Sequence, residues 1–201
     1  MKTISPGWHS RGYLPHLEMP ALIQFINFRL EDAMPLEIIK TWQEELRLIP
    51  ENRRERGVRM RIEKYLDAGH GSCFLKEPRI ARLVENALLF FDGNRYRLLA
   101  WVVMPNHVHV LIETLENHPL SGVIQAWKSY TSSTANQMLG RQGNFWQRDY
   151  FDRYIRDDGH LQACVEYIHQ NPVKAGLVNR PEAWVYSSAN RLAGVSSPPP
   201  A

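Results

Sequence analysis

The sequence predicts an α+β fold built on a small antiparallel sheet. Strand-like segments with alternating apolar and polar residues interchange along the chain with segments whose apolar residues recur at helical spacing. Two strand-like segments, 96–103 and 107–114, are separated by three residues, so we expect them to pair antiparallel. The length of 201 residues fits one domain with appendages and is too short for an eight-stranded barrel enzyme.

The first half of the domain contains one strand and two helical segments. Residues 21–30 have strand composition, and Pro35 opens a helical pattern that Pro50 closes. The segment 51–64 is strongly basic, and the plain reading of such a run is a solvated helical face.

The second half supplies the remaining elements of the sheet and its helices. In chain order we expect a helix from Pro78 to Phe91, strands over 96–103 and 107–114, a helix over 119–139, a strand over 149–156, and a last helix from Asp157 or Asp158. Pro172 should end this last helix, because the residue before a proline is disfavoured in helical conformation. The resulting order is the ferredoxin-like βαββαβ order with an appended C-terminal helix.

This order divides the chain into three parts. Residues 21–178 form the predicted domain. Residues 1–20 are rich in Pro, Gly, His and aromatic residues without a period, and we expect an irregular N-terminal arm. Residues 179–201 form a C-terminal extension that ends in a Pro-rich tail, which we expect to be disordered.

Composition excludes several classes of protein. No run of about 18 apolar residues occurs, so we expect no membrane span. Cys73 and Cys164 are too few for a disulfide framework, and the N-terminus lacks the apolar centre of a secretory signal, so we expect a cytoplasmic protein. The net charge of +3 permits a nucleic-acid partner without requiring one.

The sharpest local feature is a pair of histidines in the strand 107–114. Side chains alternate along a strand, so His107 and His109 share one face, about 7 Å apart, while Val108 and Val110 point to the other. Two neutral imidazoles on one face can converge on a cation. The alternative is a pair of half-exposed histidines without a ligand, and the spacing does not decide between the two.

The last predicted helix carries a tyrosine and an asparagine on one flank. Tyr167 and Asn171 are four residues apart, so a sheet face that meets this flank receives both side chains together. The Asn171 amide oxygen could then be a third metal ligand, and a nearby cation would favour the Tyr167 phenolate. Tyr150 and Tyr154 are rival nucleophiles without such a partner. The alternative reading is an amphipathic tyrosine and an ordinary residue near the end of a helix.

Three ordered sequence blocks together resemble the single-tyrosine HUH transposases of the IS200-like group, and within it the REP-associated tyrosine transposases. They are WVVMPNHVHVLIE at 101–113, FWQRDYFDR at 145–153 and YIHQNPVKAGLV at 167–178; the opening GWHSRGYLPH at 7–16 is similar to one REP-associated subgroup. The resemblance covers roughly residues 7–190.

The resemblance implies a nickase and strand transferase that acts on single-stranded or hairpin DNA through a 5′-phosphotyrosine. It implies that His107, His109 and Asn171 bind Mg²⁺ or Mn²⁺ and that Tyr167 is the nucleophile. Insertion-sequence members place Gln four residues after the tyrosine, whereas Asn171 is typical of the REP-associated branch. A host-resident, nucleoid-associated protein that acts on palindromic repeats is therefore favoured, as a monomer or a homodimer.

DNA binding needs cationic side chains for phosphates and aromatic faces for unpaired bases. The candidates are Arg53, Arg54, Arg59, Lys128, Arg148 and Arg153, together with Trp8, His9 and Arg11 in the N-terminal arm. Two other functions compete with the transposase: a non-catalytic domesticated hairpin-binding protein, and a metal-dependent phosphodiesterase that forms no covalent intermediate.

Overall fold

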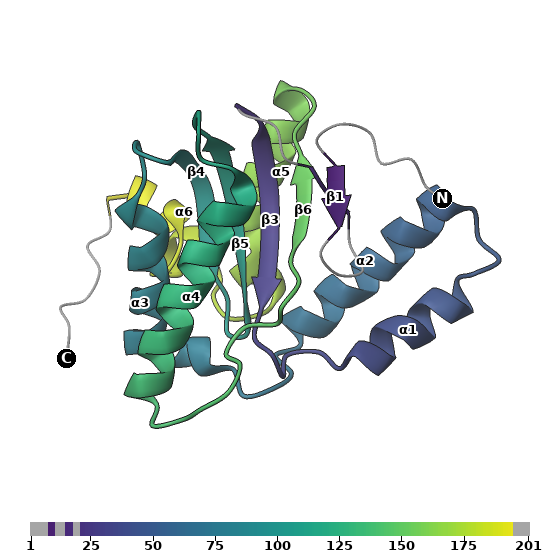
Figure 1. Ribbon diagram of the computed structural model, residues 1–201, viewed down its shortest axis with the longest axis horizontal. Coiled ribbons are helices and arrows are strands. Elements are labelled where there is room, and N and C mark those ends of the chain that lie inside the picture. The colour runs from purple at the N-terminus through teal and green to yellow at the C-terminus, as the bar shows by residue number, and fades with distance from the viewer. Residues whose placement is uncertain (1–7, 11–14, 18–20, 195–201) are drawn as a thin grey trace.

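The protein is described by a computed structural model that places residues 8–10, 15–17 and 21–194 (Figure 1). Its main sheet contains four antiparallel strands, β3 (Ile23–Arg29), β4 (Tyr96–Val103), β5 (His107–Thr114) and β6 (Phe151–Tyr154). Their spatial order is β4-β5-β3-β6, and β5 therefore lies in the interior of the sheet. This is the strand order of the predicted ferredoxin-like fold, which is thus confirmed.

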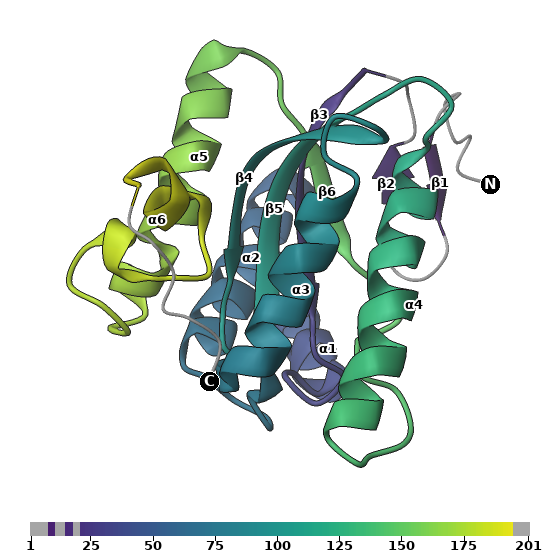
Figure 2. The ribbon, with the colours of Figure 1, turned by 90° about the vertical axis from the view of Figure 1, so that its left-hand side faces the viewer.

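Helices cover both faces of the sheet (Figure 2). They are α1 (Leu36–Glu45), α2 (Glu51–Asp67), α3 (Pro78–Phe90), α4 (Leu120–Met138), α5 (Asp158–Lys174) and α6 (Ser188–Leu192), with short 3-10 turns at Phe74–Lys76 and Pro181–Ala183. The helices α3 and α4 pack on one face over a large core that includes Val108 and Val110. On the other face α5 packs through Ile168 against a smaller core around Phe25 and Leu111.

The end of α5 differs from the prediction. Pro172 lies inside the helix, which continues to Lys174. Proline cannot donate to the carbonyl four residues earlier, here that of Ile168, but it sits so near the end that only one intrahelical bond is lost. The chain closes instead with bonds from the Ala175 amide to the Asn171 carbonyl (3.0 Å) and from the Leu177 amide to the Pro172 carbonyl (2.9 Å).

The C-terminal extension folds back on the outer edge of the sheet. The Val103 amide donates to the Tyr186 carbonyl (2.9 Å), and the Trp184 indole donates to the Val103 carbonyl (2.9 Å). Ser188 Oγ accepts from the Trp101 amide (3.1 Å). The extension therefore covers the exposed edge of β4, while the predicted disordered tail after residue 194 lies outside the described residues.

The predicted irregular arm contains two short paired strands, β1 (Trp8–Ser10) and β2 (Pro15–Leu17). A three-residue strand is too short to show a periodic pattern, which explains why the sequence gives no sign of it. Within the described part of the chain, none of the helices combines the length and the apolar character that crossing a membrane requires.

Candidate functional site

The histidine pair lies in the centre of the sheet, on the face covered by α5. His107 and His109 are each 1% exposed, which excludes the alternative of half-exposed strand histidines. Their shared face is confirmed, because Val108 and Val110 pack in the opposite core. The rings lean together, with centroids 4.7 Å apart and Nε2 atoms 3.0 Å apart, closer than an untilted strand would place them.

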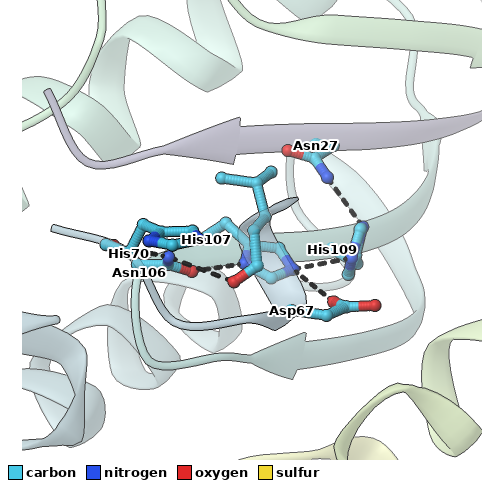
Figure 3. Close-up of polar contacts among 7 residues, drawn as sticks. Asn27, Asp67, His70, Asn106, His107 and His109 are labelled. Atoms are coloured by element: carbon cyan, nitrogen blue, oxygen red, sulfur yellow. Dashed lines mark hydrogen bonds and ion pairs between the residues drawn. The ribbon is translucent and has the colours of Figure 1, made fainter. Parts of the chain in front are cut away.

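Asn106 fixes the orientation of the first histidine (Figure 3). Its Nδ2 donates to the carbonyls of Leu66 (3.2 Å) and His70 (2.9 Å) at the end of α2. Its Oδ1 must then face His107 Nδ1, 2.7 Å away, and can only accept a proton from it. His107 therefore carries its proton on Nδ1, and its Nε2 presents a lone pair.

Asn27, on the neighbouring strand β3, contacts the second histidine. Asn27 pairs with His109 across the two strands, and its Nδ2 lies 3.1 Å from His109 Nδ1. In this arrangement the amide donates to Nδ1, so the imidazole proton sits on Nε2 and points at the free lone pair of His107. One proton is thus shared between two nitrogens that face each other.

Burial keeps both imidazoles neutral. It lowers the pKa of His109 to about 3, and it lowers that of His107 well below its usual value with help from the neighbouring His109 and Arg29. A neutral imidazole nitrogen is the form that binds a metal. His107 Nε2 presents such a nitrogen, and His109 Nε2 presents one once its proton moves to Nδ1, so these two atoms are the first two ligands of a candidate divalent-cation site.

Tyr167 packs directly on this pair. Its ring centroid lies 5.3 Å from that of His109 and 5.8 Å from that of Phe25, and Lys174 Nζ stands 5.0 Å from the ring. The hydroxyl is buried without a hydrogen-bond partner. Burial raises its pKa above the usual range, and the charges of Glu63 and Asp67 add to this, so the hydroxyl is protonated here.

Asn171 lies one helical turn beyond Tyr167. It is 0% exposed, and neither of its side-chain polar atoms has a hydrogen-bond partner. A fully buried carboxamide without partners is costly, by about 1–3 kcal/mol for each unpaired group. An oxygen in this condition is suited to a ligand that comes from outside the chain.

A pocket of about 460 Å³ opens beside the tyrosine, between α2 and α5. Its lining includes Glu63 and Asp67 of α2 with Tyr167 and Lys174 of α5. Burial raises the pKa of the Asp67 carboxyl to about 6, with a further contribution from Glu63. The strongly basic helix α2 thus also carries two carboxylates, those of Glu63 and Asp67, that line this pocket.

Four polar residues around the site are absent from the sequence-based candidates. They are Asn27, Glu63, Asp67 and Asn106. Asn106 directly precedes the histidine pair and could have been suspected there. Glu63 and Asp67 are four residues apart, a spacing that places them on one helix face, but the arginines of the same segment dominated its interpretation.

The rival tyrosines lie elsewhere. Tyr150 packs against the core on the opposite face of the sheet, and Tyr154 is 38% exposed on β6. Of the three candidates, Tyr167 is the one whose ring contacts the histidine pair.

The predicted DNA-binding residues are spread over several surfaces. Burial lowers the pKa of Arg153, and the charge of the nearby Arg59 lowers it further. Arg59 also stands 5.9 Å from the Phe151 ring. Arg53 and Arg148 are exposed, and Arg54 pairs with Glu51 at 3.8 Å.

Lys128 is engaged within the protein. Its Nζ donates to the carbonyls of Gln147 (2.5 Å) and Arg148 (2.8 Å), and burial lowers its pKa to about 8. Trp8 and His9 belong to β1, for which only the backbone is described, and Arg11 lies outside the described residues.

Residues 75–171 match the sequence profile of the family described as "Transposase IS200 like". The resemblance to IS200-like transposases is confirmed. This IS200-like segment carries both histidines, Tyr167 and Asn171, but ends before Lys174 and begins after Asp67.

The chain also resembles curated proteins. A REP-associated tyrosine transposase of Escherichia coli is 28% identical over 111 residues, 55% of this chain and 65% of that protein. A Haemophilus influenzae protein provisionally given the same name is 30% identical over 106 residues, 48% of this chain and 60% of that protein. The chain thus spans less than two thirds of the length of these relatives.

A solved structure shares the fold. It is a REP-associated tyrosine transposase bound to a REP hairpin, with a TM-score of 0.57 at 18% identity, and the match covers 92% of this chain and 87% of the other. At 18% identity this likeness concerns the fold alone, that is, the sheet and the helices that cover it.

Proposed function

We propose that this protein cleaves and rejoins single-stranded or hairpin DNA, with Tyr167 as the nucleophile and a divalent cation as cofactor. The observation that carries the proposal is the packing of the Tyr167 ring on His109, whose Nε2 faces that of His107 at 3.0 Å. Tyr167 and the unpaired amide of Asn171 both belong to α5, the helix that covers the two neutral imidazoles of β5. The relatives named above support the same substrate class.

The residues present fit Mg²⁺ or Mn²⁺. His107 and His109 would hold the ion through Nε2, and Asn171 would add the oxygen of its partnerless amide. When bound, such an ion neutralises charge on a phosphodiester and polarises its phosphorus. Asn106 orients His107 for this through its far nitrogen, and Asn27 can do the same for His109 once its carboxamide turns to accept the Nδ1 proton.

Tyr167 would supply the attacking oxygen. A bond forms between its phenolic oxygen and phosphorus, the bond from phosphorus to the 3′ oxygen breaks, and the phenolic proton ends on that 3′ oxygen. The products are a 5′-phosphotyrosine and a free 3′ hydroxyl. Since the covalent link conserves the energy of the broken bond, the reverse attack by a 3′ hydroxyl rejoins the strand.

Phosphates on either side of the cut would lie along cationic side chains. Arg59 stands beside the Tyr167 pocket and influences both Tyr167 and Arg153 electrostatically, so the two arginines link the pocket to β6. We assign contacts with the DNA phosphates first to Arg59 and Arg153, and second to the exposed Arg53 and Arg148.

A non-catalytic hairpin-binding protein is the second candidate. The raised pKa of Tyr167 favours it, because a protonated phenol is a poor nucleophile. A cation held by His107 and His109 would favour the first function, since its positive charge would lower the phenol pKa of Tyr167.

The decisive experiment is capture of a covalent adduct. The protein is incubated with Mn²⁺ and a pool of 3′-labelled hairpin oligonucleotides with randomised flanks, then denatured and separated by electrophoresis. We expect labelled protein that disappears in Tyr167→Phe and persists in Tyr154→Phe, the matched change on β6. Hairpin binding without an adduct at any metal concentration would select the non-catalytic function.

A further inference from the structure

Asp67 is the last residue of α2 and directly faces the histidine pair (Figure 3). Its Oδ1 lies 3.8 Å from His107 Nε2, and this oxygen is buried without a hydrogen-bond partner. Asn106 fixes the His107 proton on the far nitrogen, so the nearer nitrogen offers only a lone pair. Two acceptor atoms therefore face each other with no proton between them.

A cation resolves this arrangement. A divalent ion that bonds nitrogen and oxygen ligands at about 2.1 Å can bridge donor atoms up to about 4 Å apart. The spacings of 3.8 Å from Asp67 to His107 and 3.0 Å from His107 to His109 both lie within this reach. A carboxylate also supplies the negative charge that two neutral imidazoles and an amide lack, and Mg²⁺ and Mn²⁺ prefer oxygen ligands.

We infer that Asp67 is a further ligand of the divalent cation bound at His107 and His109. The inference rests on one part of the proposed function, namely that a divalent cation binds at the histidine pair. Asp67 lies outside the IS200-like segment, which starts at residue 75. The cation site would therefore draw on a helix that precedes the segment as well as on β5 and α5.

The position of Asp67 is fixed by its neighbours. Asn106 donates to the carbonyls of Leu66 and His70, on either side of Asp67 in the chain, and so ties the end of α2 to the start of β5. Leu66 is itself buried in the main core. The backbone that carries the carboxylate is thereby held against the histidines.

The side chains of the candidate ligands are not yet arranged around a common point. Among the residues that the structure describes, no three His, Cys, Asp or Glu side chains gather as metal ligands do. Binding thus requires the Asp67 carboxylate, which is joined to the backbone by two rotatable bonds, to turn toward the ion. Glu63, one turn earlier on α2, pairs with Arg59 at 3.6 Å and lines the same pocket, which makes it a matched control.

The test is a Mn²⁺ titration of the full chain without DNA, followed by electron paramagnetic resonance of the free ion and by calorimetry. We expect Asp67→Asn and Asp67→Ala to weaken Mn²⁺ binding by about 10-fold or more, and Glu63→Gln by less than about threefold. Circular dichroism confirms that each variant is folded, and Asp67→Asn keeps the size of the side chain.

The outcomes separate this inference from the proposed function. Wild-type affinity in both Asp67 variants, with binding lost in His109→Ala, overturns the Asp67 assignment and leaves the histidine site intact. No Mn²⁺ binding by the wild-type protein overturns the metal site together with Asp67.

Discussion

Asn106 holds His107 in a single tautomer. The carboxamide is anchored by two carbonyl acceptors on one side, so the 2.7 Å contact on the other side can only receive the Nδ1 proton. Orientation of a metal-binding imidazole by a hydrogen bond to its far nitrogen is a general feature of such sites. Here the orienting group takes its own orientation from the end of α2.

Replacement of Asn106 by Asp should destabilise the fold. The new oxygen would face the carbonyls of Leu66 and His70 with no proton to donate, and we expect a loss of about 1–3 kcal/mol in the free energy of unfolding. Urea denaturation measures it. Asn136→Asp is the control, because Asn136 Nδ2 donates to one carbonyl, that of Gly143, near the surface, and should cost less than Asn106→Asp. Equal losses in both variants would contradict the anchoring role.

Asn27 should control the second imidazole. With its Nδ2 directed at His109 Nδ1, it keeps the proton on the nitrogen that has to bind the cation. A half-turn of the carboxamide is therefore part of metal binding. In Asn27→Asp a carboxylate accepts the Nδ1 proton without any turn, and we expect tighter Mn²⁺ binding, whereas Asn27→Leu should weaken it by about 10-fold or more. Calorimetric titration checks the order, and weaker binding in Asn27→Asp than in Asn27→Leu would refute it.

Acid should destabilise the metal-free protein through its buried histidines. His109 has a pKa of about 3 when folded, against about 6.5 in an unfolded chain, so the unfolded state binds more protons between these values. Stability must then fall as pH decreases through that window. The raised pKa of Asp67, about 6, acts in the opposite direction and is shared by all variants compared.

Substitution of His109 by Gln isolates this effect. We expect the variant to lose about 1 kcal/mol less stability than the wild-type protein between pH 6.5 and 5.5, measured by urea denaturation in EDTA. An identical pH dependence in both proteins would show that His109 titrates normally.

Alternation along β5 was sufficient to predict that the histidines share a face, and helical spacing was sufficient to place Tyr167 and Asn171 on one flank. Both are local rules, and both residue pairs are near neighbours in sequence. The contact between Asp67 and His107 joins residues 40 positions apart through the end of a helix, and no local pattern specifies it. The prediction that Pro172 ends the last helix was wrong, because a local rule does not show that α5 tolerates the loss of one hydrogen bond near its end.

The cationic candidates should separate into DNA contacts and structural residues. Lys128 Nζ donates hydrogen bonds to the carbonyls of Gln147 and Arg148. Lys128→Met should therefore lower the free energy of unfolding without changing the affinity for hairpin DNA. Arg59 acts electrostatically on both Tyr167 and Arg153, and a phosphate near the two arginines would relieve the repulsion between their like charges.

Arg153→Gln should therefore weaken hairpin binding and reduce the salt dependence of affinity. Loss of one phosphate contact to a single strand lowers the slope of log K against log salt by about 0.7. Fluorescence anisotropy with a labelled hairpin over a range of salt concentrations measures it. Arg79→Gln is the control, because Arg79 already pairs with Glu77 at the start of α3. A salt slope that changes in Lys128→Met but not in Arg153→Gln would reverse the assignment, and would place the DNA along α4 rather than along β6.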